Sequence, residues 1–127
     1  MDTYLASMTV PFTFEAAHYM EGDASVDTNA RMHGHSFRCL VTIKGPVDAQ
    51  THMIMPFEQL NEKLQQLRKQ LDHRLLNDVE GLENTSGECL AKWIYDQLKK
   101  DVVTLHKIVL DRPLVGISVE YSAEEMS

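Results

Sequence analysis

The chain has 127 residues, 43% of them hydrophobic, which predicts a single domain over residues 1–127 with a core of its own. Its 19 acidic and 12 basic side chains give a net charge of −7, which argues against sequence-independent nucleic-acid binding because that needs a basic face. The same balance does not exclude a local basic pocket for a phosphorylated small molecule.

Membrane and export segments are not expected either. No apolar run approaches the roughly 18 to 20 residues that a membrane span requires, so no membrane partner is expected. Residues 1–4 lack the positive charge and the long apolar run that open a signal peptide. Cys39 and Cys89 lie far apart in apolar surroundings, which favours two buried thiols over a disulfide. We therefore expect a cytoplasmic protein.

The first part of the chain predicts two strands separated by a loop. The side-chain types of residues 9–14 alternate with the period of two that is typical of a strand. Residues 20–31 have no period and many turn formers, which indicates a loop. Residues 33–44 are rich in aromatic and β-branched side chains and predict a second strand, which Gly45-Pro46 ends.

The second part predicts two helices and then two more strands. A first helix starts after Pro56, with an apolar face formed by Phe57, Leu60, Leu64, Leu67 and Leu71. A second begins near Thr85–Glu88, where a hydroxyl can cap the first turn, and its buried face holds Cys89, Leu90, Trp93, Ile94 and Leu98. Residues 104–111 and 114–121 predict strands joined at Arg112-Pro113. The order ββααββ predicts an α+β fold, with a four-stranded antiparallel sheet covered on one face by two helices.

Three histidines form the most informative pattern of the chain. His33 and His35 are two residues apart on a predicted strand, so both imidazoles lie on one face of it. His18 follows the strand that would pair with this one. A single histidine is more often a hydrogen-bonded core or surface residue, but three imidazoles with an open fourth position are typical of catalytic zinc. We therefore predict that Zn²⁺ binds His18, His33 and His35.

Asp72-His73, directly after the first helix, is a candidate proton-handling pair. An aspartate can orient a histidine and stabilise its charged form. Adjacent residues need not face each other, and the alternative is a helix C-terminus at which His73 meets the helix dipole. Glu88 is another candidate acid, although the sequence favours a first-turn helix acid there, and Asp111 lies at a strand end where turn acids are common.

Four segments together resemble the family of 6-pyruvoyl-tetrahydropterin and 6-carboxy-tetrahydropterin synthases, and more closely the bacterial 6-carboxy-tetrahydropterin synthases of queuosine biosynthesis. They are Phe14-Glu15-Ala16-Ala17-His18, His33-Gly34-His35-Ser36-Phe37, Leu71-Asp72-His73-Arg74-Leu75-Leu76-Asn77, and Gly81-Leu82-Glu83-Asn84 continuing to Ile94. The resemblance implies a tunnelling fold whose subunits assemble as a homo-oligomer, a trimer or hexamer, with active sites between subunits.

The same resemblance implies a lyase that removes triphosphate from 7,8-dihydroneopterin triphosphate and shifts protons along the pterin side chain. The three histidines would hold zinc, and Asp72 and His73 would move protons. Asp111 stands where a glutamate generally anchors the pterin ring in the family, with a side chain that is shorter by one methylene. Ser86 and Glu88, at the start of the second helix, complete the candidate substrate-binding set.

One departure from the family concerns the catalytic cysteine that precedes the His-x-His pair. Its two usual places hold Asn29 and Asp27 here. Cys39 lies past His35, about 13 Å along the strand at about 3.3 Å per residue, and Cys89 matches no catalytic position. Asp27 could supply a carboxylate base in place of the thiol. A further departure, Pro56 where an aspartate is common, suits a helix start.

Three functions stay open at this point. The first is a zinc-dependent synthase of this family with altered activity. The second is an aldolase-type cleavage of a pterin side chain, with Asp27 or His73 as base. The third is a paralogue that binds zinc and a pterin without catalysis.

Overall fold

The computed structural model describes residues 3–20 and 30–123, and its elements follow the predicted order. Two long strands, β1 (Leu5–His18) and β2 (His33–Pro46), are followed by the helix α2 (Phe57–Leu71). A two-residue strand β3 (Arg74–Leu75), a 3₁₀ turn η1 (Leu76–Asp78) and the helix α3 (Gly87–Lys99) come next. The strands β4 (Leu105–Arg112) and β5 (Ile117–Tyr121) end the described fold.

The strands form one sheet in the order β3-β1-β2-β4-β5. The β1–β2, β2–β4 and β4–β5 pairs are antiparallel, as predicted. The sheet has a fifth strand that the sequence did not predict, because β3 pairs in parallel with Ala16 and Ala17 of β1. The predicted antiparallel four-stranded sheet is therefore extended to a mixed five-stranded one.

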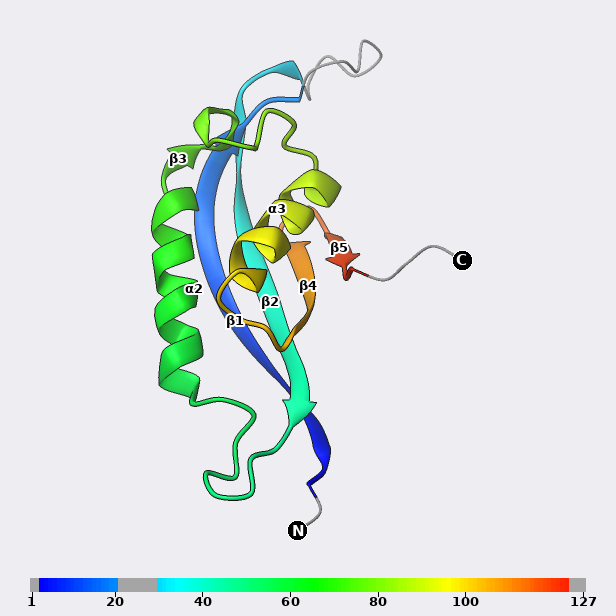
Figure 1. Ribbon diagram of the computed structural model, residues 1–127. Coiled ribbons are helices and arrows are strands. Elements are labelled where there is room, and N and C mark those ends of the chain that lie inside the picture. Colours follow the sequence, from blue (N-terminus) through cyan, green and yellow to red (C-terminus); the bar gives the residue numbers. More distant parts are fainter. Residues whose placement is uncertain (1–2, 21–29, 124–127) are drawn as a thin grey trace.

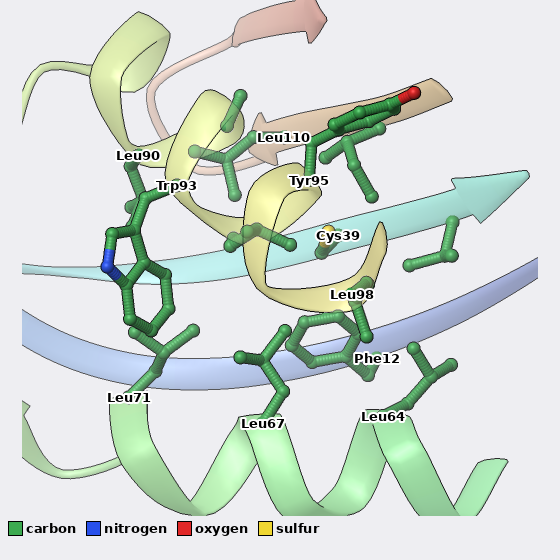
Figure 2. Close-up of a cluster of buried hydrophobic side chains, with 14 of the residues drawn as sticks. Phe12, Cys39, Leu64, Leu67, Leu71, Leu90, Trp93, Tyr95, Leu98 and Leu110 are labelled. Carbon is green, nitrogen blue, oxygen red and sulfur yellow. The ribbon is translucent and has the colours of Figure 1, made fainter. Parts of the chain in front are cut away.

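Both helices cover the same face of this sheet (Figure 1). α2 packs along β1, whereas α3 packs on β4 and β5. Figure 2 shows leucines of α2 and α3 meeting Phe12 and Cys39 of the sheet between them. Leu64, Leu67 and Leu71 lie on the predicted apolar face of α2, since a spacing of three and four residues returns to one side of a helix.

The structure corrects two predictions about the apolar faces of the helices. Cys89 is exposed, not buried. It lies on the outer face of α3 with Lys92 and Asp96, while Leu90 begins the buried face. Phe57 is also largely exposed, since it stands at the first turn of α2, beyond the edge of the core.

The last two strands are joined by a turn that is longer than predicted. β5 begins at Ile117 because residues 113–116 fold back on the end of β4. The amides of Val115 and Gly116 both donate to the Arg112 carbonyl, at 3.0 and 2.9 Å. Gly116 has a φ of 81°, which a residue with a Cβ adopts only with strain. Across the described part of the chain, no helix has the length and apolar character of a membrane span.

We expect Leu71→Ala to lower the free energy of unfolding by about 2 to 5 kcal/mol, because it removes a core side chain and leaves a cavity. Leu71 is 0% exposed, whereas Leu114 on the β4–β5 turn is 87% exposed. Urea unfolding at a fixed protein concentration measures the change. Leu114→Ala is the matched control and should change stability by less than about 0.5 kcal/mol. Equal effects of the two substitutions would contradict the packing described here.

Candidate active site

The ends of two paired strands bring the three histidines together. His18 is the last residue of β1 and pairs directly with His33, the first residue of β2. His35 pairs with Ala16, so strand alternation places all three imidazoles on the face that the helices cover. The ring centroids are 4.5 Å apart for His18 and His33, 5.0 Å for His18 and His35, and 4.9 Å for His33 and His35. One nitrogen of each ring lies within 4.8 Å of the others.

Hydrogen bonds orient two of these rings. Nδ1 of His18 lies 3.1 Å from the Thr85 carbonyl oxygen and 3.2 Å from Thr85 Oγ1. A carbonyl can only accept, so Nδ1 carries the proton and Nε2 keeps a lone pair. Nδ1 of His33 is oriented in the same way by the Arg31 carbonyl, at 2.7 Å. Partners of this kind fix the tautomer of histidines that bind metals.

The cluster fits a metal ion. Nε2 of His18 and Nε2 of His35 are buried without a hydrogen-bond partner in the described structure. Buried polar atoms without a partner cost free energy, and a Lewis acid at this point would remove that cost. Three imidazole nitrogens with a remaining open position match the ligand set of catalytic zinc.

The surroundings favour the neutral form of the His18 and His35 imidazoles, which is the form that binds a metal. Burial, followed by the charges of His33, His35 and Arg112, lowers the pKa of His18 to about 4, although the Thr85 backbone opposes the shift. Burial and then the Arg112 and His33 charges lower the pKa of His35 as well. Neither ring is therefore protonated at neutral pH.

The predicted proton-handling pair forms a contact. Nδ1 of His73 lies 2.9 Å from Asp72 Oδ2, and Arg68 approaches the same oxygen at 3.2 Å. The Glu15 amide donates to Asp72 Oδ1 at 2.9 Å, and the His73 amide donates to the Glu15 carbonyl at 2.6 Å. His73 has a φ of 59°, an uncommon left-handed conformation that directs the chain onto β1. The Glu15 amide and then His73 lower the pKa of Asp72, so its carboxylate stays ionised.

A hollow of about 690 Å³ is lined by one residue of each of these two groups. Its wall includes His35 of the histidine cluster and His73 of the pair, together with Glu15 and Ser36, whose hydroxyl donates to the Glu15 carboxylate at 2.7 Å. The other lining residues are Ala16, Ala17, Gly34, Arg74, Leu75, Leu114 and Val115. Strand alternation puts the Glu15 and Ser36 side chains on the sheet face opposite the three imidazoles, so the hollow lies on that face and borders the cluster at His35.

The other predicted site residues do not line this hollow within one chain. Ser86 caps α3 by accepting from the Cys89 amide at 3.2 Å, and Glu88 is exposed in the first turn of that helix. Asp111 is paired with Arg38 at 2.8 Å on the sheet face that lacks helices. The candidate base Asp27 and the neighbouring Asn29 lie outside the described residues.

Sequence reasoning missed four residues of the site. Thr85 was treated only as part of a helix start, yet it orients His18. Glu15 and Arg68 hold Asp72. Arg112 was treated as a turn residue, yet its charge acts on His18 and His35. Of these four, Glu15 and Thr85 stood inside the segments that carry the family resemblance.

Comparisons with known proteins agree with this architecture. The sequence model of the family described as 6-pyruvoyl tetrahydropterin synthase matches residues 7–122. A 6-carboxy-5,6,7,8-tetrahydropterin synthase of Synechocystis sp. is 39% identical over 106 residues, which cover 76% of this chain and 78% of that protein. A dihydroneopterin monophosphate aldolase of Pyrococcus furiosus is 29% identical over 90 residues, covering 71% and 72%.

Solved structures share the fold. The 6-pyruvoyl tetrahydropterin synthase of Caenorhabditis elegans superposes with a TM-score of 0.84 at 23% identity, covering 98% of this chain and all of that one. A catalytic-residue mutant of the Plasmodium vivax synthase superposes with a TM-score of 0.71 at 17% identity, covering 94% and 99%. At these identities the likeness establishes the architecture alone.

We expect His33→Ala to abolish stoichiometric zinc binding, because it removes one of three converging nitrogens. Elemental analysis after loading with zinc and gel filtration gives the metal content per chain. His106→Ala is the matched control, since His106 is exposed on β4, apart from the cluster, and should leave the zinc content unchanged. An unchanged zinc content in His33→Ala would show that the metal assignment is wrong.

In the metal-free protein we expect the free energy of unfolding to fall as the pH drops below about 6.5. The pKa of His18 is about 4 in the folded chain against an ordinary 6.5, so the unfolded chain takes up a proton first and gains stability. The loss should be about 2 kcal/mol between pH 7 and 5. Urea unfolding in EDTA measures this difference. His18→Gln should remove that part of the slope, and an identical slope in both proteins would contradict the assignment.

Proposed function

Because this chain belongs to the 6-pyruvoyl tetrahydropterin synthase family, we propose that it is a zinc-dependent pterin lyase resembling 6-carboxy-tetrahydropterin synthase. Its substrate is 7,8-dihydroneopterin triphosphate or a close relative. The observation that carries the proposal is one hollow whose wall includes both His35 of the histidine cluster and His73 of the Asp72-His73 pair.

His18, His33 and His35 would hold the zinc ion. When bound, zinc supplies Lewis-acid chemistry, which polarises the oxygens of the pterin side chain and acidifies the adjacent C–H and O–H bonds. The neutral state of His18 and His35 suits this role, since both carry lowered pKa values.

His73 is the proposed proton carrier. Its Nδ1 donates to the ionised Asp72 carboxylate, which leaves Nε2 free to accept a proton from the substrate. The Asp72 charge then stabilises the imidazolium, and Glu15 and Arg68 keep that carboxylate in position. Proton removal by His73 and proton return at the next carbon would together shift hydrogen along the side chain.

The residue that replaces the family cysteine is proposed to be Asp27, with His73 as the alternative base. An amide such as Asn29 has no basic lone pair at neutral pH. One solved structure of the Plasmodium vivax synthase is a variant in which a catalytic glutamate was changed to cysteine. A carboxylate at a catalytic position is therefore compatible with this fold.

The chain is proposed to act as a homo-oligomer, a trimer or a hexamer, with active sites between subunits. The His73 side chain is 80% exposed in the single chain, and the hollow is open to solvent. Ser86, Glu88 and Asp111 lie away from the hollow of their own chain, so a second copy is needed to bring them to a pterin.

A second candidate function is an aldolase-type cleavage of the side chain. The observation that favours it is the similarity to the Pyrococcus furiosus protein that is named dihydroneopterin monophosphate aldolase. Together with the absence of a thiol at residues 27 and 29, this similarity keeps cleavage by a carboxylate base open. A paralogue that binds zinc and a pterin without turnover is the third candidate.

Product identification separates these functions. Zinc-loaded protein is incubated with 7,8-dihydroneopterin triphosphate, with and without acetaldehyde trapping, and the pterins are identified by mass spectrometry. We expect a 6-carboxy or 6-pyruvoyl product, strongly reduced in His73→Gln. A 6-hydroxymethyl product would assign the cleavage reaction instead. Unchanged substrate that still binds saturably would assign the non-catalytic paralogue.

Asn29→Cys is the companion variant. If only the thiol limits a synthase reaction, this variant gains product by a large factor. No gain, with pterin binding retained, would support the non-catalytic paralogue.

A further inference from the structure

Arg68 joins the proton-handling pair to the edge of β1. Its Nε donates to the Thr13 carbonyl at 2.7 Å, and its Nη2 lies 3.2 Å from Asp72 Oδ2. The Arg68 carbonyl also accepts the Asp72 amide at 2.8 Å. Thr13 and Glu15 are two residues apart, so their backbone groups point to the same edge of the strand. Arg68 and Glu15 therefore fasten Asp72 to one short stretch of β1.

The Asp72 carboxylate is shared among three donors. Oδ1 accepts the Glu15 amide at 2.9 Å, whereas Oδ2 contacts both Nδ1 of His73, at 2.9 Å, and Nη2 of Arg68. The Asp72 side chain is only 15% exposed, so little of it remains open to water. A guanidinium keeps its charge at any physiological pH. One oxygen of Asp72 therefore has a permanent cation and an imidazole side by side.

The charge of Arg68 also acts on His73 directly. Because Asp72 Oδ2 lies 3.2 Å from one nitrogen and 2.9 Å from the other, the two nitrogens are at most about 6 Å apart. At this separation a like charge disfavours the protonated form of an imidazole. Arg68 thus opposes the stabilisation that Asp72 gives to a charged His73.

In the described part of the chain, the other charged and titratable residues around His73 line the hollow with it. They are Glu15 of β1, His35 of β2 and Arg74 of β3. The β4–β5 turn adds only uncharged residues to this wall. Arg68 differs from all of these side chains because it contacts the carboxylate that orients His73.

The proposed chemistry gives this arrangement a purpose. His73 takes a proton from one carbon of the side chain and returns it at the next. A proton carrier is most effective when its proton affinity matches the working pH. An aspartate that served His73 alone would stabilise the imidazolium fully and would slow the return of the proton. A guanidinium on the same oxygen weakens that stabilisation.

We propose that Arg68 is a positioning residue that lowers the proton affinity of His73 by taking up part of the Asp72 charge. Arg68 acts through Asp72, since it is not part of the wall of the hollow. The inference rests on the proposed function and deepens it, because it names the residue that sets the pH range in which the pair moves protons.

The first test follows the His73 ring by NMR in the zinc-loaded protein between about pH 5.5 and 9. The chain has six histidines, so the signal of His73 is assigned by its loss in His73→Gln. We expect Arg68→Gln to move the midpoint of this titration upward by about 0.3 to 0.7 pH units, as for the loss of a charge from a partly exposed pair. Arg68→Lys keeps the charge and loses the Nε bond to Thr13, so its midpoint should stay closer to that of the wild type.

The second test is the pH profile of kcat/KM for 7,8-dihydroneopterin triphosphate. We expect the acidic limb to move upward in Arg68→Gln by the same amount as the NMR midpoint. A merely structural role of Arg68 would lower the plateau of the profile and leave the limb in place.

Lys69→Gln is the matched control. It removes one positive charge from the same last turn of α2, but Lys69 is exposed and forms no ion pair with Asp72. Both the midpoint and the acidic limb should match those of the wild type. Circular dichroism and urea unfolding check that each variant is folded. Arg68→Met, which keeps an apolar stem without the charge, takes the place of Arg68→Gln if that variant does not fold.

Three outcomes would overturn the assignment of Arg68. They are an unchanged or lowered midpoint in Arg68→Gln, an equal shift in Arg68→Lys, and an equal shift in Lys69→Gln, which would indicate an effect of net charge alone. If the wild type turns over no pterin, the proposed function fails. The NMR midpoints then decide the inference separately, because they require no turnover.

Discussion

The antiparallel pairing of β1 with β2 is the constraint on which the rest of the structure depends. All 14 residues of β1 pair with β2, from Leu5 opposite Pro46 to His18 opposite His33. The side chains of a strand alternate, so a slip of one residue would turn the whole inner row of β1 to the other face. The rings of Phe14 and Phe37, stacked at 4.8 Å between centroids, oppose such a slip. The register that packs the core therefore also brings the three histidines together.

A second constraint ties the end of α2 to the same strand. The backbone of Glu15 donates to Asp72 and accepts from His73, so two hydrogen bonds of one residue hold the proton-handling pair. Glu15 lies three residues before His18 on a strand, where the rise is about 3.3 Å per residue. The distance between the two groups is thus set by backbone geometry rather than by flexible side chains, which suits a site that must hold its geometry within fractions of an ångström.

The sequence predicted features that depend on neighbouring residues and missed those that depend on residues far apart along the chain. The helix faces of Leu64, Leu67 and Leu71 and the shared face of His33 and His35 are local periodicities, and the structure has both. β3 was missed because two residues carry no period. The bond between Glu15 and Asp72 spans 57 residues, and that between His18 and Thr85 spans 67. No local pattern records such partners, because they meet only after the sheet and the helices have packed.

The site lies where the packed core can offset its unfavourable contribution to the folding free energy. The partnerless nitrogens of His18 and His35 and the left-handed backbone of His73 are each unfavourable in the free chain. His18 ends β1, His35 lies near the start of β2 and His73 follows α2, whereas Phe12, Phe14, Leu64 and Leu67 pack within those elements. The core can therefore stabilise the fold while the site keeps its unfavourable geometry. Within the described residues, the buried side-chain nitrogens left without a hydrogen bond are Nε2 of His18 and Nε2 of His35, on one sheet face. A metal ion satisfies both lone pairs at once, which no further hydrogen bond within the packed core provides.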